Sequence, residues 1–290
     1  MARIGETDLI LNEDGSVYHL SLLPRNISDI IIAVGDPNRV YRVSEYFDDV
    51  EFEMNKREFI THVGTYKGKR VTVISTGIGT DNVEICLTEL DALANIDLKT
   101  REPKSRKKKL KIIRVGTSGA LQEDIPVGSH LITDYAVGLD NLMSFYDLKH
   151  DSFEKEIGDN LQKEIELPVK PYVVRGSEVL RKHFGAEMIT GNTITTPGFY
   201  APQGRELRIA ARYPKLLDDL NFYHHKGSDF WLTNFEMETA AYYALGRLLG
   251  HEVVSVNAII ANRIKNKVSK DPNKVVDGLI KKVLDKIEAL

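Results

Sequence analysis

Short runs of apolar, mostly β-branched residues recur along the chain and are separated by stretches with helical spacing. Continuous apolar runs of this length are typical of strands that are buried on both faces of a sheet. The pattern predicts six such strands, over residues 30–34, 71–75, 111–115, 129–133, 186–190 and 253–260. Because strands and helices alternate, we predict an α/β protein with a largely parallel or mixed central sheet.

Three segments between and after these runs have apolar residues at helical spacing. They are residues 82–94, with Asp81 as a candidate N-cap; residues 236–249, followed by Gly250; and residues 273–290. A glycine directly after the second segment suits a left-handed helix end. The chain is therefore predicted to have helices flanking the sheet.

Composition narrows the class of protein. A chain of 290 residues, of which 42% are hydrophobic, can bury a large core, and α/β folds often run this long as one domain. We predict one domain over 1–290, with an N-terminal extension at 1–16. The net charge of -3 gives no overall basic field for nucleic acid, and the single Cys86 suits a reducing compartment. No apolar run reaches the length of a membrane span, so a cytoplasmic protein is expected.

A basic segment at 99–111 departs from this pattern because it holds several lysines around Pro103. It could bind a polyanion, or it could be a solvated loop inserted before a strand. No aromatic residues lie between the charges to stack on bases, which favours the loop.

Candidate anion-binding residues follow two of the predicted strands. Gly35 ends the first strand and lets backbone N–H groups approach an oxyanion, with Arg39 one turn later. Arg114 ends an otherwise apolar strand, and Thr117 lies three residues on. A guanidinium in such a strand needs an anionic partner, and Arg binds phosphate through a bidentate fork. Arg57 is a further candidate, although single arginines are more often surface ion pairs.

The segment 199–205 contains side chains suited to a planar base. Gln203 can donate and accept hydrogen bonds at once, whereas Arg205 can only donate. Together they match the edge of uracil, which presents two carbonyl acceptors around one N–H donor. Phe199 would offer an aromatic face to the ring, and Gly204 allows a bend between the two polar residues. Taken alone, the segment is more often a surface turn.

Two carboxylates open the second predicted helix. Glu236 and Glu238, on either side of Met237, can accept hydrogen bonds from a sugar diol, and a helix N-terminus stabilises their charge. Ordinary acidic residues at a helix start give the same pattern. His19 is a lone histidine near the N-terminus, and His224 and His225 are predicted to be a surface pair because no further ligands lie at metal spacing.

These residues together resemble the nucleoside phosphorylase superfamily, and the matches run in order from Val17 to Arg263. The chain is similar to the members of that superfamily that act on uridine, whose marker is the Gln-x-Arg pair at 203–205. The resemblance implies a distorted, barrel-like mixed sheet flanked by helices. It also implies reversible phosphorolysis of uridine to uracil and ribose 1-phosphate, in pyrimidine nucleoside salvage.

The resemblance also assigns roles, residue by residue. It implies phosphate binding by Gly35, Arg39, Arg57, Arg114 and Thr117; base binding by Phe199, Gln203, Arg205 and Arg263; and ribose binding by His19, Glu236, Met237 and Glu238. Arg114, Glu238, Gln203 and Arg205 are expected to carry catalysis. His19 and Arg57 would come from a neighbouring subunit, so a homodimer or higher oligomer is expected.

No cofactor is expected, because inorganic phosphate is the co-substrate. In some bacterial relatives, residues matching Glu58 and Ser75 hold a monovalent cation between subunits, so the resemblance implies a possible cation site there.

Three alternatives remain open at this point. Purine-cleaving relatives have an acidic residue where this chain has Asn262, which argues against a purine nucleoside phosphorylase. The arginines of the phosphate site argue against a nucleoside hydrolase on the same fold. A non-catalytic nucleoside-binding protein would be expected to lack parts of the site.

Overall fold

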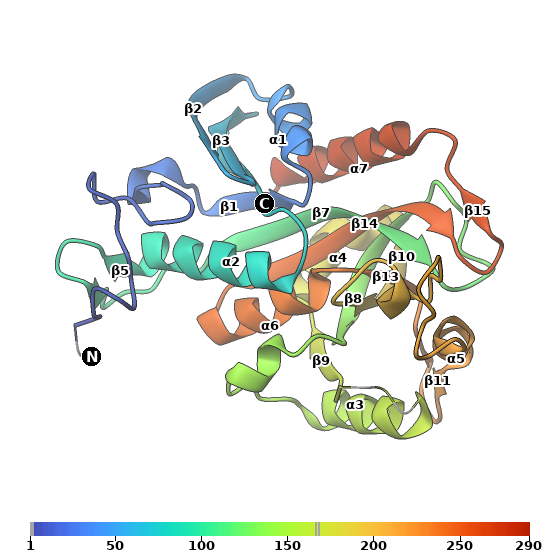
Figure 1. Ribbon diagram of the computed structural model, residues 1–290. Helices are drawn as coiled ribbons and strands as arrows, with labels where there is room; N and C mark the ends of the chain where they lie inside the picture. Colours follow the sequence, from blue (N-terminus) through green and yellow to red (C-terminus); the bar gives the residue numbers. More distant parts are fainter. Residues whose placement is uncertain (1–2, 166, 168) are drawn as a thin grey trace.

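The computed structural model describes residues 3–165, 167 and 169–290. Most of its strands join one twisted, mixed sheet (Figure 1). The strands of this sheet are β1 (Ile30–Val34), β2 (Asp49–Lys56), β3 (Phe59–Tyr66), β4 (Lys69–Ser75), β7 (Lys111–Ala120), β8 (His130–Gly138), β9 (Tyr172–Arg175), β10 (Ile189–Thr195), β13 (Asn234–Glu236), β14 (Glu252–Asn262) and β15 (Lys267–Val268). Their order is β15-β14-β8-β10-β13-β7-β1-β4-β3-β2, with β9 beside β8.

Five of these strands close on themselves. β7 pairs parallel with β14 and antiparallel with β13, while β14 also pairs antiparallel with β8. β10 lies between β13 and β8, which completes the circuit β7-β13-β10-β8-β14. A closed circuit leaves no free strand edge within it. The predicted α/β fold with a mixed, barrel-like sheet is confirmed.

At the centre of the sheet, β1 ends beside two longer parallel strands. Val115 of β7 lies between Val34 of β1 and Val256 of β14, and the three strands run parallel. β7 runs on to Ala120 instead of ending in the predicted turn after residue 115, so Gly116 lies within the strand, next to Gly35, which directly follows β1. Ligands of α/β proteins bind at such carboxyl ends of strands.

Helices cover both faces of the sheet. They are α1 (Pro37–Ser44), α2 (Thr80–Asn95), α3 (Ser152–Ile165), α4 (Glu178–Phe184), α5 (Leu216–Phe222), α6 (Thr239–Leu249) and α7 (Pro272–Ile287). Figure 1 shows α2 and α6 on one side of the central strands and α7 on the other. Among the described residues, no helix is both long and apolar enough to cross a membrane.

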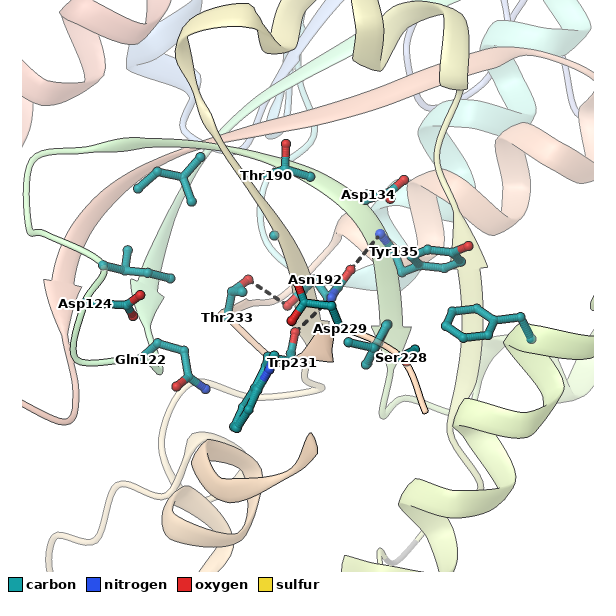
Figure 2. A pocket seen from close by; sticks show the side chains of 15 residues that line it. Gln122, Asp124, Asp134, Tyr135, Thr190, Asn192, Ser228, Asp229, Trp231 and Thr233 are labelled. Carbon is teal, nitrogen blue, oxygen red and sulfur yellow. Dashed lines mark hydrogen bonds between the residues drawn. The ribbon is translucent and has the colours of Figure 1, made fainter. Parts of the chain in front are cut away.

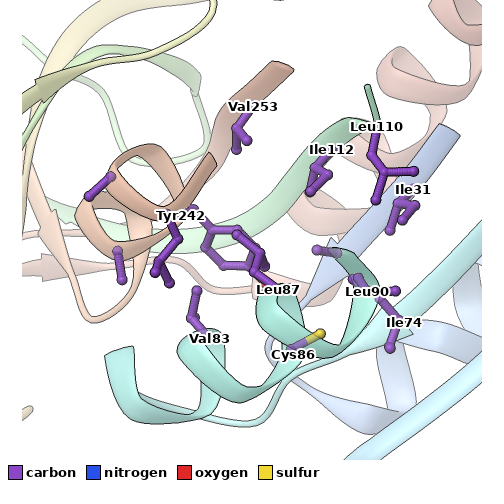
Figure 3. Close-up of a cluster of buried hydrophobic side chains, with 14 of the residues drawn as sticks. Ile31, Ile74, Val83, Cys86, Leu87, Leu90, Leu110, Ile112, Tyr242 and Val253 are labelled. Carbon is purple, nitrogen blue, oxygen red and sulfur yellow. The ribbon is translucent and has the colours of Figure 1, made fainter. Parts of the chain in front are cut away.

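The largest apolar cluster packs α2 and α6 against the strands (Figure 3). Leu87 and Leu90 of α2, Tyr242 of α6 and Ile112 of β7 are all fully buried in it. Burying each such aliphatic side chain contributes about 1.5–3 kcal/mol. On the other face α7 buries Leu279 and its apolar neighbours against β7 and β14. Both clusters hold the strand ends in place.

The strand bounds differ from prediction where polar residues interrupt the apolar runs. β8 continues to Gly138 rather than ending at residue 133, and β10 covers Ile189–Thr195 rather than 186–190. β14 ends at Asn262, two residues beyond the predicted end. A strand is held by its backbone ladder, so it runs on through polar side chains such as that of Asn192, past a register shift after Gly191.

Three helices also differ from prediction. α2 begins at Thr80 with Gly79 in the cap position, so Asp81 lies inside the helix and is not its N-cap. α6 begins at Thr239 rather than at 236, because Glu236 is the last residue of β13. α7 covers Pro272–Ile287. The predicted end of α6 is confirmed, since Gly250 follows it with a φ of 79°.

The basic segment 99–111 lies on the surface. It contains β6 (Glu102–Pro103), which forms a small hairpin with β5 (Ile96–Asp97), and it leads into β7. Two of its lysines form ion pairs with acidic neighbours: Lys108 Nζ lies 3.0 Å from Asp29 and Lys109 Nζ lies 3.1 Å from Glu252. Part of the positive charge is therefore balanced locally.

Candidate active site

A cavity of about 1080 Å³ lies at the carboxyl ends of β1, β7 and β13 and beside the segment after β10. Of the thirteen residues predicted to bind substrate, eleven line this cavity, and Glu58 lines it too. The eleven are Gly35, Arg39, Arg114, Thr117, Phe199, Gln203, Arg205, Glu236, Met237, Glu238 and Arg263. Residues from segments more than 200 positions apart thus meet in one place.

A second cavity of about 790 Å³ lies elsewhere, and no predicted site residue lines it. It is bordered by Asp124, Asp134 and Asp229 and by Trp231 (Figure 2). Asn192, at its centre, donates to the Trp231 carbonyl at 2.9 Å and accepts from the backbone N–H of Tyr135 at 3.4 Å. No arginine or lysine is among its lining residues, so the larger cavity is the candidate for binding an anion.

Arg114 lies at the buried end of the larger cavity, between two carboxylates. Its guanidinium lies 2.7 Å from Glu236 and 2.5 Å from Glu238, and it donates to Asn257 at 2.9 Å. The side chains of all three charged residues are less than 10% exposed. Burial opposes the charge of Arg114, but the two carboxylates raise its pKa. The predicted anionic partner of Arg114 is therefore present within the chain itself.

Gly116 is required beside this guanidinium. A Cβ atom on Gly116 would lie 2.0 Å from the Arg114 Nη1 atom, far inside contact distance. The glycine of the predicted turn thus makes room for the arginine side chain two residues earlier. This is a packing reason for the glycine that the sequence pattern alone did not reveal.

Arg39 lies beside Arg114 on the first turn of α1. Its Nη1 donates to the carbonyl of Val115 at 3.0 Å, and its buried Nε has no hydrogen-bond partner among the described residues. Burial lowers the pKa of Arg39 to about 10, which leaves it charged at neutral pH. An unpaired buried N–H donor next to a second guanidinium is suited to an oxyanion.

Glu236 and Glu238 differ in what their carboxylates can still bind. Glu236 accepts from the Thr195 hydroxyl at 2.7 Å and from the backbone N–H of Thr239 at 2.9 Å, and so caps α6. With Arg114 also bound, its acceptor sites are largely occupied. Glu236 therefore supports Arg114 and the start of α6. A ribose ligand, as predicted, would need free acceptor sites on its carboxylate.

Glu238 keeps acceptor capacity. Its Oε1 accepts from the backbone N–H of Gly79 at 2.9 Å and its Oε2 from Arg114. A carboxylate offers about four lone-pair sites, so two remain for hydroxyl groups. Burial raises the pKa of Glu238, and Arg114 partly offsets that shift.

The segment after β10 forms the other end of the cavity. Arg205 donates to the Gln203 Oε1 at 2.5 Å and to the Phe199 carbonyl at 2.7 Å, across the positive-φ turn at Gly204. Arg263, which directly follows β14, donates to the Gln203 carbonyl at 2.9 Å and so holds this turn. Burial, together with the nearby Arg263, lowers the pKa of Arg205 to about 10.

Phe199 is placed differently from our expectation. The Arg205 guanidinium lies over its ring, 3.8 Å from the centroid, so the arginine covers a face that was expected to meet the base. Such a cation–π contact is attractive but modest, about 0.5–1 kcal/mol at an exposed site. Phe199 is 50% exposed.

His19, Arg57 and Ser75 do not line the cavity of their own chain. His19 pairs through Nδ1 with Glu89 at 2.7 Å, and Arg57 lies at the exposed turn between β2 and β3 with a φ of 54°. The Ser75 hydroxyl is bonded to the backbone N–H of Ile60 and to the carbonyl of Glu58. Their predicted contributions across a subunit boundary stay predictions.

The prediction of a histidine surface pair is wrong for one of its members. His225 of β11 (His224–His225) is buried and lies 3.0 Å from the Asn160 amide, because this strand pairs with β12 (Phe230–Trp231). His224 stacks on Trp231. Among the described residues, no group of three or more His, Cys, Asp or Glu side chains is arranged to hold a metal ion.

Sequence reasoning missed several residues of the cavity. Asp36, Asn82 and Lys267 line it, and Thr196 lies behind Gln203 and accepts a hydrogen bond from its amide at 3.0 Å. Thr196 lies only seven residues before Gln203, but no pattern indicated that its side chain turns toward the amide.

Comparison with known proteins agrees with this geometry. The family model of the phosphorylase superfamily matches residues 29–288, which is most of the chain. The chain belongs to the phosphorylase superfamily. It is an enzyme, and the predicted resemblance is confirmed.

The relatives that match this chain include both uridine phosphorylases and purine nucleoside phosphorylases. The uridine phosphorylase of Thermococcus kodakarensis is 30% identical over 262 residues, covering 89% of this chain and 82% of the relative. A DeoD-type purine nucleoside phosphorylase of Streptococcus suis is 27% identical, covering 83% and 84%. A crystal structure of a Trypanosoma brucei nucleoside phosphorylase, described as showing uridine phosphorylase activity, superposes with a TM-score of 0.89 at 29% identity, covering 98% of this chain and 100% of that one.

Proposed function

We propose that this enzyme is a uridine phosphorylase, a pentosyltransferase that reversibly converts uridine and phosphate to uracil and ribose 1-phosphate. The observation that carries this proposal is the Gln203–Arg205 pair, which lies in the same cavity as the buried Arg39 and Arg114. A uracil edge and a phosphate ion can be bound there at once. The names of the T. kodakarensis and T. brucei relatives support the same activity.

The base end suits the leaving group of this reaction. Uracil presents O4 and O2 as acceptors around the N3–H donor. Arg205 can donate to a carbonyl, while Gln203 Oε1, which has two lone pairs, can accept from N3–H as well as from Arg205. As the glycosidic bond breaks, its electron pair moves onto uracil, and Arg205 stabilises the charge on the carbonyl oxygen to which it donates.

The other end suits phosphate and ribose. Phosphate would bind between Arg39 and Arg114, next to Gly35 and to Thr117 of β7. Glu238 would accept from the ribose hydroxyls and hold C1′ over the phosphate. The C1′–N1 bond breaks with oxocarbenium character on the ribose, and a phosphate oxygen then bonds to C1′. The proton of hydrogen phosphate ends on uracil, so no protein nucleophile, metal or cofactor is required.

Two predicted ligands require a second copy of the chain under this proposal. His19 and Arg57 lie outside the cavity of their own chain, and the resemblance assigns them to a neighbour's ribose and phosphate. We therefore propose at least a homodimer with shared sites. The substrates are small and soluble, which suits a cytoplasmic enzyme of pyrimidine salvage.

A purine nucleoside phosphorylase is the second candidate, since relatives of that name match the chain. Asn262 weighs against it. Its amide donates to the carbonyls of Gln122 and Ile125 at 2.8 and 2.9 Å, and its Oδ1 accepts from the Lys265 N–H. The amide is neutral and fully bonded, so it offers no acidic proton to a purine leaving group.

The test is cleavage of uridine by purified protein, followed by absorbance, with and without phosphate and with inosine in parallel. We expect phosphate-dependent loss of uridine and little change in inosine. Cleavage of inosine at a comparable rate would favour the purine enzyme. Cleavage of uridine without phosphate would favour a hydrolase, and no cleavage of either would leave a nucleoside-binding protein.

A further inference from the structure

Thr196 is a buried residue directly after β10 that does not line the cavity. Its Oγ1 lies 3.0 Å from the carbonyl of Gly198 and 3.2 Å from the carbonyl of Glu236. The same oxygen lies 3.0 Å from Nε2 of Gln203. The Thr196 hydroxyl is therefore surrounded by two backbone carbonyls and one side-chain amide.

This arrangement fixes what the Thr196 hydroxyl can offer. A hydroxyl has one proton to donate and two lone pairs, whereas a carbonyl oxygen can only accept. Donating the proton to Gln203 would leave both carbonyls facing an oxygen lone pair at 3.0 and 3.2 Å, so the proton goes to one of the carbonyls and Oγ1 is left to accept. The group of Gln203 that faces Thr196 must then be its NH2 group.

The oxygen and nitrogen ends of an amide side chain have nearly the same shape, so its hydrogen-bond partners decide which way it points. With NH2 turned toward Thr196, the Gln203 Oε1 faces Arg205 in the cavity. The opposite orientation would direct NH2 donors at the Arg205 guanidinium, which can also only donate. It would present the same donors to the N3–H of uracil.

From this geometry we propose that Thr196 is a positioning residue that sets the orientation of the Gln203 amide for recognition of the uracil edge. This inference rests on the proposed function. Thr196 does not touch the base and acts only through Gln203. Glu236 provides a weaker second restraint, since its carbonyl lies 3.4 Å from Nε2.

The test is a double-mutant cycle on uridine phosphorolysis. Thr196→Val has a similar shape but no acceptor, and we expect it to lower kcat/KM by about 10-fold, the size of one hydrogen bond of about 1.4 kcal/mol. Thr196→Ser restores the acceptor and should stay within about 3-fold of wild type. Because Thr196 acts through Gln203, adding Thr196→Val to Gln203→Ala should cause no further loss.

Thr133→Val is the matched control, because Thr133 is also a fully buried threonine, and Thr193 is the one hydrogen-bond partner of its hydroxyl among the described residues. It should leave kcat/KM near wild type. An unchanged kcat/KM in Thr196→Val, or a further 10-fold loss in the Gln203→Ala background, would overturn the proposal. Thr196→Ala gives the same cycle if the valine variant does not fold. Wild-type protein that leaves uridine intact would instead overturn the proposed function itself.

Discussion

The two ends of the candidate active site are built in different ways. At the phosphate and ribose end, Arg114, Glu236 and Glu238 are buried, paired with one another and held by strands and the start of α6. At the base end, Phe199 and Arg205 lie on a turn outside the regular elements and contact each other. The first end is organised before any ligand binds. At the second, Arg205 occupies one face of Phe199, so a base must lie on the other face or displace the arginine.

The difference has an energetic consequence. A buried charged network is costly to break, because removing one partner leaves an uncompensated charge. A partly exposed turn contributes little to the free energy of unfolding. Changes at the first end should therefore reduce both stability and activity, whereas changes at the second should reduce activity alone.

Arg114→Ala should have the largest effect. It leaves two buried carboxylates facing each other, so we expect the free energy of unfolding to fall by about 3–5 kcal/mol. Loss of the guanidinium should lower kcat/KM by about 1000-fold. Urea unfolding and steady-state kinetics measure the two. Lys108→Ala, which removes an exposed pair with Asp29, should change stability by less than about 1 kcal/mol; an equally small change for Arg114→Ala would contradict the contrast.

Glu238→Gln should lower kcat/KM by about 100- to 1000-fold, because it removes the charged acceptor that we propose for the ribose hydroxyls. Burial raises the pKa of the Glu238 carboxyl above its usual 4.5. In wild type the ionised form, and activity with it, is lost as the pH falls through that raised pKa. The Gln variant lacks this step, and titration of phosphate is common to both proteins. Parallel pH profiles would show that Glu238 does not control the acid side.

Arg205→Ala should lower kcat/KM for uridine by about 100-fold, the cost of one donor to developing charge. The free energy of unfolding should change by less than about 0.5 kcal/mol, and phosphate binding measured by calorimetry should be retained. Arg208→Ala is a matched control, since Arg208 is exposed on the same segment and does not line the cavity. Turnover within a few-fold of wild type in Arg205→Ala would refute the role given to Arg205.

Phe199→Ala should have the smallest effect. Loss of the aromatic face should raise KM for uridine by about 10-fold, and kcat should change less. Leu207→Ala, an exposed apolar change eight residues along, should leave KM unaltered. A fall in stability comparable to that of Arg114→Ala would mean that the base end is as tightly built as the phosphate end.

The base end was the easier of the two to predict from sequence. Phe199, Gln203 and Arg205 lie within seven residues, so one local motif is enough to predict that they act together. Their contact with one another was not predicted, because stacking depends on the turn at Gly204 and on which partners lie nearby. Thr196 was missed for the same reason.

The phosphate and ribose end depends on long-range pairing. Arg114 and Glu238 are separated by more than 120 residues and meet only because β7 lies beside β13 and β14. Sequence identified each residue but not the ion pair between them, nor the capping of α6 by Glu236. Apolar runs predicted the central strands, whereas β8 and β10 extended through polar residues that their barrel neighbours hold in register.

The most direct test of the account is to follow the phosphorus itself. Uridine and phosphate are incubated with the protein, and the 31P NMR spectrum is recorded while uracil release is measured by absorbance. We predict that a new phosphate-ester signal of ribose 1-phosphate grows in step with uracil, one for one. Release of uracil with an unchanged phosphate signal, or no release at all, would contradict the claim that this cavity joins phosphate to the ribose of uridine.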